Sequence, residues 1–600
     1  MNTVGKRTKL FEAAKRLGEV ALGKRPADLI IRDGVLVNVF TGELLEHTDV
    51  VVSGDRIALV GKALKEHEGP DTKVIEANGQ HIVPGLIDGH MHVESTMLSV
   101  TEFSKAALAK GTTTVFMDPH EIANVFGIEG VRYMHEEGQQ LPLKVYTTFP
   151  SCVPATDDLE DAGASLTVAD IKEGLTWDNV QGLGEVMNFP GVVHGDNKMH
   201  GELAETIKAG KTVTGHFPSE DPYALQAYIA AGVTSDHETI AKEDALAKLR
   251  AGLHVQIREG SAWRDVKEVI KVITEYNVDT RNISLVTDDV YPETLITKGH
   301  MNHVVRRAIE EGLDPVTAIQ LATINSARYF HMENDIGSIS AGKFADLLII
   351  EDLQQMEASL VVADGSILFE KGELQQTFPA YTYPDAVRNS VHLGREMKAD
   401  DFLHRTDRPD GDVLVNVVKA IEGSARTEKM TATLQVQDGT VQIDKKQDII
   451  HLACIDRHKG TGQISNVFVH GFQFQHGAVA STVAHDSHNL LVMGVDREDM
   501  AIAANRLAEI GGGLVAVRNG EVLAELPMPI AGLMSDQPLE TVVEQVSNLV
   551  KAWENLGCGI TDPIMTFSLI ALAVIPEIRV TNRGLADVTT FELIDVVISD

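Results

Sequence analysis

Eight short apolar segments recur along the first half of the chain, and most are separated by 20 to 30 residues of helix-like composition, such as SVTEFSKAALAKG. The segments are VPGLIDGH (83–90), TTTVFMD (112–118), LKVYTTF (143–149), VQGLGEV (180–186), TVTGH (212–216), VTSDH (233–237), LHVQI (253–257) and ISLVTD (283–288). Alternation of strand and helix repeated eight times is typical of a parallel barrel. We therefore predict a (β/α)8 TIM-type barrel over residues 83–330.

The segments on either side of this region have a different texture. Residues 27–82 and 331–375 contain short strand-like runs divided by Gly and Asp turns, for example DLIIRDGVLVN and SLVVADGSILFEKGEL. Such runs are typical of half-buried strands. We expect the two segments to pair into one small β-sandwich domain into which the barrel is inserted.

The two ends of the chain complete the expected organisation. Residues 1–26 include a basic amphipathic stretch, which we predict to be a helix packed on its own protein rather than a targeting peptide. After residue 376 the alternation stops at a linker rich in Pro and Tyr, FPAYTYPDAV. Residues 376–600 mix strand-like and helix-like runs, so we predict a C-terminal α+β domain. The expected class is α/β with two further domains.

Metal-ligating residue types gather at the ends of the predicted barrel strands, where the active site of such a barrel lies. Residues two apart on a strand point the same way, so His90 and His92 can both reach one ion. The full candidate set is His90, His92, Glu185, His216, His237 and Asp288. Imidazole and carboxylate groups suit a divalent metal such as Zn, Fe or Mn and require no thiolate. The pattern predicts a metal-dependent hydrolase.

Charge and cysteine usage exclude several other classes. The formal net charge is −35, and a chain this acidic repels phosphate backbones, so we expect no nucleic-acid partner. No stretch approaches 18 consecutive apolar residues, so we expect no membrane span. Three widely spaced cysteines indicate a reducing compartment, and we predict a cytoplasmic protein.

Several motifs resemble those of a known family. PGLIDGHMHVES is similar to the first-strand motif of the amidohydrolase superfamily, and GSISAGKFADLLIIE is similar to the returning strand of its β-sandwich. More narrowly, MDPHEIANVFG, GLGEVMNFPGV, TSDHE and TDDVYPETLITKGHMNHVVRRAIEEG resemble adenine deaminases. The C-terminal motifs GAVASTVAHDSHNLLVMG and ELPMPIAGLMSD resemble that family's additional domain. The resemblance spans nearly the whole chain.

This resemblance implies hydrolysis of adenine to hypoxanthine and ammonia, as in purine salvage, at a site with two Mn²⁺ or Fe²⁺ ions; the ligand types also allow Zn²⁺. Many members of the superfamily bridge two metals with a carboxylated lysine on the fourth strand, where this chain has Glu185 and no lysine. Glu185 could bridge two ions with its two oxygens, which we favour. Alternatively, at a site with a single ion, it could contact the ligands without binding the metal itself. Deamination of a modified purine, cyclic-amide hydrolysis and a non-catalytic relative remain alternatives.

The resemblance also suggests roles for individual residues. A metal-activated hydroxide would attack C6 of adenine, Asp288 would pass the proton to the departing amine, and His237 would stabilise charge on the oxygen. Asp289 competes with Asp288 for the ligand position, and we favour Asp288. Candidates for contacting the purine are Glu121, which we also count among the catalytic residues, Ser95 and Asp118; alternatively, Ser95 caps a helix and Asp118 braces a histidine.

Two further expectations concern regions outside the barrel. His485 and His488 in AHDSHN are spaced for a metal site, but no further ligand is obvious in the sequence. We therefore expect packing, or a wall of the active-site mouth. We expect a small-molecule purine as substrate and a homo-oligomer, with a dimer favoured.

Overall fold

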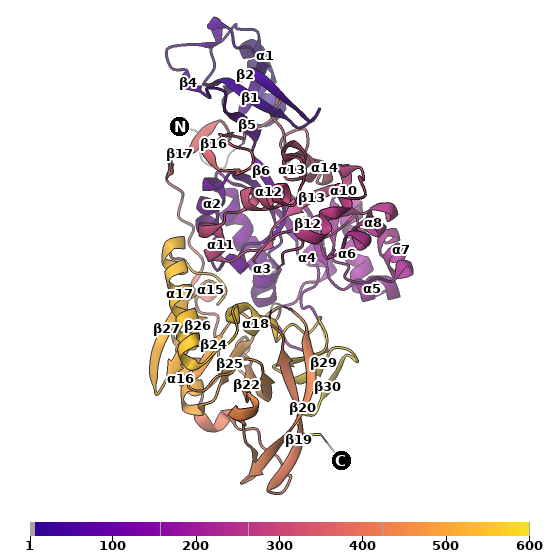
Figure 1. The fold of residues 1–600 in the computed structure, drawn as a ribbon, viewed down its shortest axis with the longest axis vertical. Coiled ribbons are helices and arrows are strands. Elements are labelled where there is room, and N and C mark those ends of the chain that lie inside the picture. Colours follow the sequence, from indigo (N-terminus) through magenta and orange to yellow (C-terminus); the bar gives the residue numbers. More distant parts are fainter. Residues whose placement is uncertain (1–6, 157, 262, 423, 599–600) are drawn as a thin grey trace.

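The computed structural model describes residues 7–598 apart from 157, 262 and 423. Figure 1 shows a β-rich part at one end, the barrel in the middle and the C-terminal region at the other end. Residues 1–6 of the predicted N-terminal segment lie outside the described residues. Within the described part of the chain, no helix has the length and apolar character needed to cross a membrane.

The barrel strands form where the apolar segments predicted them. They are β6 (Leu86–His92), β7 (Thr112–Met117), β8 (Lys144–Phe149), β9 (Val180–Val186), β10 (Thr212–Gly215), β11 (Ser235–Asp236), β12 (His254–Arg258), β13 (Ile283–Val286) and β14 (Asp288–Asp289). Nearly all of their residues are buried, as expected for parallel strands covered on both faces. The predicted (β/α)8 architecture is confirmed.

Two sheet segments make up the closed barrel. One has the order β10-β9-β8-β7-β6-β14 and the other the order β11-β12-β13. Only Thr287 separates β13 from β14, which pairs in parallel with β6 and so closes one side. On the other side the Thr234 amide donates to the Val213 carbonyl at 3.0 Å, which joins β10 to the segment that leads into β11.

Helices that lie between successive strands or follow the last one cover the outside of the barrel (Figure 1). They are α2 (Val100–Ala109), α3 (His120–Gln139), α4 (Val168–Gly174), α5 (Phe189–His194), α6 (Asn197–Lys208), α7 (Pro222–Ala230), α8 (Lys242–Ala251), α9 (Val266–Val269), α10 (Lys271–Thr274), α11 (Pro292–Thr297), α12 (Met301–Glu310), α13 (Pro315–Leu321) and α14 (Ile324–Tyr329). Side-chain caps start several of them. Ser99, for example, accepts the Glu102 amide at the start of α2.

The predicted first strand is too long at its start. Val83 and Pro84 belong to β5 (His81–Pro84), which pairs with β15 (Leu347–Ile350) outside the barrel. The chain crosses between the two sheets at Gly85, where a Cβ would lie 2.2 Å from Oγ1 of Thr113. Continuous apolar character therefore hides a change of sheet at a glycine.

Strands from both flanks of the barrel form one sheet in the order β18-β17-β16-β15-β5-β1-β2-β3, with β4 paired to β1. The remaining strands are β1 (Leu29–Asn38), β2 (Glu43–Ser53), β3 (Arg56–Gly61), β4 (Lys73–Glu76), β16 (Ala358–Ala363), β17 (Ser366–Glu370) and β18 (Glu373–Leu374). Apolar residues from the two flanks share one core cluster that includes Val50 and Val362. Helix α1 (Leu10–Ala21) buries Ala13, Leu17 and Val20 against this sheet.

The C-terminal region is built on a second large sheet, β21-β20-β19-β23-β22-β25-β24-β26-β27. Its strands are β19 (Gly411–Ala420), β20 (Thr427–Gln437), β21 (Thr440–Val441), β22 (Ile449–Ile455), β23 (Ile464–His470), β24 (Ala478–Ser481), β25 (Leu490–Gly494), β26 (Gly513–Arg518) and β27 (Glu521–Pro527). Helices α15 (Asp385–Arg388), α16 (Arg497–Ile510), α17 (Leu539–Leu556) and α18 (Pro563–Leu569), and the small sheet of β28 (Ile578–Thr581), β29 (Gly584–Asp587) and β30 (Glu592–Ile594), complete it.

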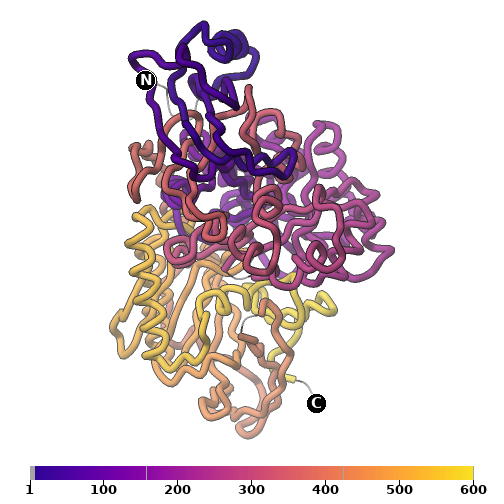
Figure 2. Tube along the Cα trace, turned by 45° about the horizontal axis from the view of Figure 1, so that its top comes forward, coloured from indigo at the N-terminus to yellow at the C-terminus, as the bar shows by residue number. Residues whose placement is uncertain are grey.

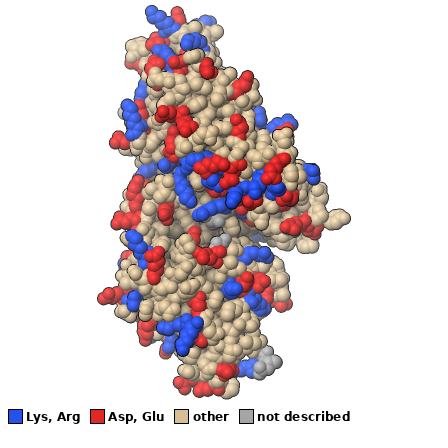
Figure 3. Space-filling model, viewed as in Figure 1, with Lys and Arg blue, Asp and Glu red and all other residues tan. Residues whose placement is uncertain are grey.

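The barrel and the C-terminal region are packed directly against each other. One apolar cluster contains Phe103 and Leu143 of the barrel together with Tyr383 and Phe567 of the C-terminal region. Figure 2 shows the same close arrangement from a second direction. On the face in Figure 3, Lys and Arg side chains lie among Asp and Glu side chains.

Candidate metal and catalytic centre

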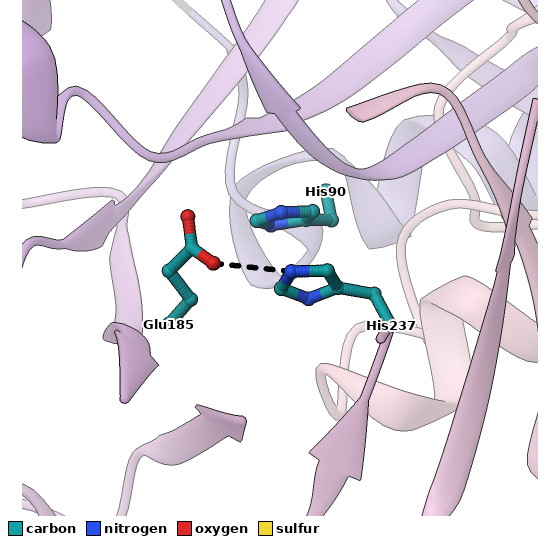
Figure 4. A group of neighbouring side chains, drawn as sticks. All are labelled: His90, Glu185 and His237. Carbon is teal, nitrogen blue, oxygen red and sulfur yellow. Dashed lines mark ion pairs between the residues drawn. The ribbon is translucent and has the colours of Figure 1, made fainter. Parts of the chain in front are cut away.

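The six residues predicted to bind metal converge at one end of the barrel. His90 and His92 lie on β6, Glu185 on β9 and Asp288 on β14, and His216 and His237 directly follow β10 and β11. The His90 and His237 rings stack with centroids 4.0 Å apart. Figure 4 shows both rings beside the Glu185 carboxylate.

Glu185 is at the centre of the cluster. Its Oε2 lies 2.7 Å from Nδ1 of His216 and 3.0 Å from Nε2 of His237. Its Oε1 lies 3.3 Å from Nε2 of His92 on the other side. The two carboxylate oxygens therefore face different histidines, so each oxygen lies beside a different set of potential metal ligands.

The donor set fits a divalent metal. Triads of ligand atoms lie within 4.8 Å of one another, among them His90–Glu185–His237 and His90–His92–Asp288. Nε2 of His90 and Nδ1 of His237 are buried and have no hydrogen-bond partner in the described part of the chain. Buried polar atoms normally have partners, and a bound cation would satisfy the ring nitrogen of His90.

The tautomer of His92 is fixed by the backbone. Its Nδ1 lies 2.9 Å from the carbonyl oxygen of Asp118, so Nδ1–H donates to that carbonyl. The lone pair is then on Nε2, which faces Oδ1 of Asp288 at 3.4 Å and Glu185. A second hydrogen bond of this kind commonly orients a metal-binding histidine.

His120 is a member of the cluster that the sequence reasoning missed. It begins α3 immediately after strand β7, is 5% exposed, and its Nδ1 lies 3.5 Å from Oε1 of Glu185. With His92 and Glu185 it forms a further triad of potential ligands. The motif MDPHE contains the signal, since the histidine follows a barrel strand, but its neighbour Glu121 carries the same kind of signal at the same strand end.

Asp288 and Asp289 have different surroundings. Asp288 faces His92, and its Oδ2 accepts a hydrogen bond from Arg258 at 3.0 Å. Asp289 instead accepts hydrogen bonds from the Ser95 hydroxyl and from Nε1 of Trp263. Only Asp288 therefore directs an oxygen at the histidine cluster.

Arg258, at the end of β12, is a second residue that the sequence did not identify. Its guanidinium is buried and contacts Glu238, Asp265 and Asp288. Burial disfavours the cation, but the surrounding carboxylates, Glu238 first, outweigh it and raise the Arg258 pKa. Burial raises the pKa of Asp288, but the neighbouring Arg258 charge, which donates to Oδ2, outweighs it and holds this pKa below its ordinary value.

The three residues predicted to contact the purine all have protein partners. Ser95 donates to Asp289, and Oδ2 of Asp118 accepts the Glu185 amide at 2.8 Å. Both oxygens of Glu121 face histidines of the C-terminal region: Oε1 lies 2.5 Å from Nδ1 of His485, and Oε2 contacts Nε2 of His488. His485 and His488 therefore border the barrel site, as a wall of its mouth would.

Comparison with known proteins gives matches over nearly the whole chain. Residues 81–368 match the Amidohydrolase family, and residues 424–592 match the Adenine deaminase C-terminal domain. A protein of Moorella thermoacetica named adenine deaminase is 50% identical, and the match covers 98% of this chain and 99% of the relative. One of Mesorhizobium japonicum with the same name is 48% identical, over 98% of this chain and 97% of the relative.

Proposed function

This chain belongs to the adenine deaminase family of the amidohydrolases, and on that premise we propose that it hydrolyses adenine to hypoxanthine and ammonia. The observation that carries the proposal is the Glu185 carboxylate, which faces His216 and His237 with one oxygen and His92 with the other. A hydrolase that removes an amine from a purine needs an activated water and a group that moves its proton. The clustered histidines and carboxylates can hold a metal that activates water, and Asp288 in the same cluster can move the proton.

The amidohydrolases are metal-dependent, and the clustered histidines and carboxylates are able to hold metal. We propose two Mn²⁺ or Fe²⁺ ions per chain, with Zn²⁺ as an alternative. The ligands would be His90, His92, Glu185, His216, His237 and Asp288, with His120 close enough to join them. When bound, such ions lower the pKa of water toward neutrality and polarise the group under attack.

Asp288 is the proposed proton carrier. Its Oδ1 takes a proton as the water oxygen bonds to C6, and it delivers that proton to the exocyclic nitrogen as the C6–N bond breaks and ammonia leaves. The electron pair that shifts into the ring on attack returns when the amine departs. Arg258 holds Oδ2 of Asp288, so the free oxygen keeps one direction through both transfers. His237 stabilises the charge that develops on the oxygen.

The residues predicted to touch the purine have supporting roles in this scheme. Asp118 holds the backbone of Glu185, and Ser95 orients Asp289 at the edge of the site. Trp263 donates to the same Asp289 carboxylate and lies in an apolar cluster with Met565 and Leu569 of the C-terminal region. We propose that this group forms the substrate side of the pocket.

The proposal extends to the domain boundaries, the oligomeric state and the cellular compartment of the protein. We propose domains at 1–26, at 27–82 with 331–375, at 83–330 and at 376–600, with the barrel domain binding metal. We also propose a homo-oligomer, a dimer in the simplest case, in the cytoplasm. Cys152, Cys454 and Cys558 are all free, which is consistent with a reducing compartment.

A screen of ammonia release by Mn²⁺-loaded enzyme tests the function directly. Adenine should release one equivalent of ammonia and yield hypoxanthine, with N6-substituted purines and cyclic amides turned over more slowly. Faster turnover of an N6-substituted purine would favour the modified-purine alternative. Ring opening of a dihydropyrimidine without activity on adenine would overturn the proposal in favour of cyclic-amide hydrolysis.

A further inference from the structure

A loop of the C-terminal region brings two histidines against the barrel site. The loop connects β24 to β25 and carries His485 and His488, which are 7% and 1% exposed. Both rings contact Glu121 in the first turn of α3, which is itself 2% exposed. Three ionisable side chains from two regions are thus buried together.

His488 has a defined tautomer. The Ala484 amide donates to Nδ1 of His488 at 3.2 Å, so this nitrogen carries the lone pair. Nε2 then carries the proton and donates to Oε2 of Glu121. A metal on Nε2 would need the lone pair there, so this tautomer argues against a separate metal site at Glu121, His485 and His488.

The loop holds His488 rigidly. Arg457 donates to the His488 carbonyl through Nε, and to the Ala531 carbonyl at 3.0 Å and Ser390 at 3.2 Å through its other nitrogens. The His488 amide donates to the Ala484 carbonyl at 2.7 Å. The position of the Glu121 carboxylate is therefore set by the C-terminal region as much as by the barrel.

His485 is oriented by the other oxygen of Glu121. Its Nδ1 lies 2.5 Å from Oε1, which is also 3.5 Å from Nε2 of His120 in the ligand cluster. The contacts of His485 with described side chains run through Nδ1, to Glu121 and at 3.9 Å to Asp486, and the side chain keeps 9% exposure, so Nε2 lies toward accessible space. One nitrogen is committed to Glu121, and the other is available at the boundary of the site.

Deamination of adenine is favoured by a hydrogen-bond donor at a ring nitrogen, and Nε2 of His485 can serve as that donor. Attack at C6 pushes an electron pair into the ring, and a donor at a ring nitrogen stabilises the product of that attack. Burial lowers the pKa of His485, but the negative charge of Glu121 and then that of Asp289 outweigh it and raise the pKa to about 9, which favours a ring that is protonated on both nitrogens. Glu121 first, then Asp289 and Asp486, are the carboxylates that act on this ring.

We propose that His485 is a catalytic residue supplied by the C-terminal region, with Nε2 donating to a ring nitrogen of the substrate purine, and that Glu121 and His488 are its positioning residues. The inference rests on the proposed deamination of a purine. It assigns the C-terminal region a direct part in the chemistry. It also explains why Glu121, although close to the ligand cluster, has both oxygens occupied by imidazoles.

Steady-state kinetics of the full-length, Mn²⁺-loaded chain test the proposal. In His485→Ala, kcat should fall about 100-fold or more while KM changes much less. Metal content and the thermal midpoint should match those of the wild type, and added imidazole should restore part of the rate. The exposed His476 in the same region provides a matched control, and His476→Ala should behave as the wild type.

His488 separates positioning from packing. His488→Gln retains an N–H that can reach Glu121 and should keep kcat within about threefold, whereas His488→Leu should lower kcat about tenfold. Equal losses in these two variants, or a His485→Ala variant with near-normal kcat or no response to imidazole, would overturn the inference while the wild type still releases ammonia. A wild-type chain that releases no ammonia from adenine would overturn the proposed function itself.

Discussion

At the residue scale, the pair Asp288 and Asp289 shows how neighbouring carboxylates acquire different roles. Asp288 lies between His92 and Arg258, whereas Asp289 is held by Ser95 and Trp263. The backbone of Asp288 has a φ of 60°, a left-handed conformation that Asp tolerates better than most residues. This conformation directs successive carboxylates to different partners.

We expect Asp288→Asn to lower kcat by about 10³-fold, because an amide cannot accept and return the proton. Metal content should fall much less, because the histidines and Glu185 remain. Stopped assays of ammonia release together with elemental analysis measure the two quantities. Asp289→Asn is the comparison variant, and it should lose less activity. A smaller loss at Asp288 than at Asp289 would reverse the assignment.

Arg258 should be a major determinant of stability. It is 1% exposed, and removing it would leave Glu238, Asp265 and Asp288 without their shared cation. Breaking a buried ion pair from one side typically costs about 3–5 kcal/mol, so Arg258→Gln should lower the free energy of unfolding by about that amount. Urea unfolding of the metal-free protein measures this. A loss below about 1 kcal/mol would show that the carboxylates find other partners.

The sequence identifies functional residues that stand at the ends of predicted strands, and His90, His92, Glu185 and the two later histidines were predicted for that reason. It did not identify Arg258, because its three partners come from separate segments and only the closed barrel brings them together. The pairing of Glu121 with His485 spans more than 360 residues and depends on how two regions pack. No local pattern encodes such a contact.

At the element scale, strand β9 depends on a glycine next to its ligand. A Cβ at Gly184 would lie 2.3 Å from Oδ2 of Asp118, the oxygen that accepts the Glu185 amide. The strand therefore needs a residue without a side chain at this position. The motif GLGEV thus reflects packing against the Asp118 side chain, which directly follows β7, as well as the chemistry of Glu185.

We predict that Gly184→Ala displaces Asp118 and shifts Glu185, which should weaken metal binding about 10- to 100-fold. Competition with a chelator measures the affinity. Gly18→Ala in α1 is the matched control, since a Cβ there meets nothing within 4 Å and alanine is the better helix former. It should leave metal affinity unchanged. Equal affinities in all three proteins would contradict the bracing role of Asp118.

The elements themselves were largely predictable. Buried parallel strands are continuous apolar runs and their covering helices are polar on one side, so the alternation identified the barrel. The weakest prediction was the start of the first strand, where residues 83–84 belong to another sheet. Apolar character reports burial and not the sheet to which a buried residue belongs, so this boundary depends on tertiary structure.

At the scale of the whole molecule, the junction of the barrel with the C-terminal region contains a buried carboxyl group with a raised pKa. Glu160, in the loop after β8, is 2% exposed and lies near Asp486. Burial first and Asp486 second raise the pKa of Glu160 to about 8. The folded-state pKa exceeds the unfolded value of 4.5. The contribution of this group to the free energy of unfolding is therefore greatest below pH 4.5, and it declines as pH rises from 4.5 to about 8.

Glu160→Gln should remove this decline. The free energy of unfolding of the variant minus that of the wild type should rise by roughly 1–3 kcal/mol from pH 5.5 to pH 8.5. Urea midpoints at the two pH values give the difference, and Glu43→Gln, at an exposed position, should show none. Parallel pH dependence in the Glu160 variant and the wild type would mean that Glu160 does not ionise differently in the folded state.

The central claim is that Glu185 joins two metal ions in one deaminase site, and metal stoichiometry tests it most directly. We expect two equivalents of Mn²⁺ or Fe²⁺ per wild-type chain, and one or fewer in Glu185→Ala together with loss of adenine-dependent ammonia release. One equivalent in a fully active wild type, unchanged in Glu185→Ala, would contradict the claim.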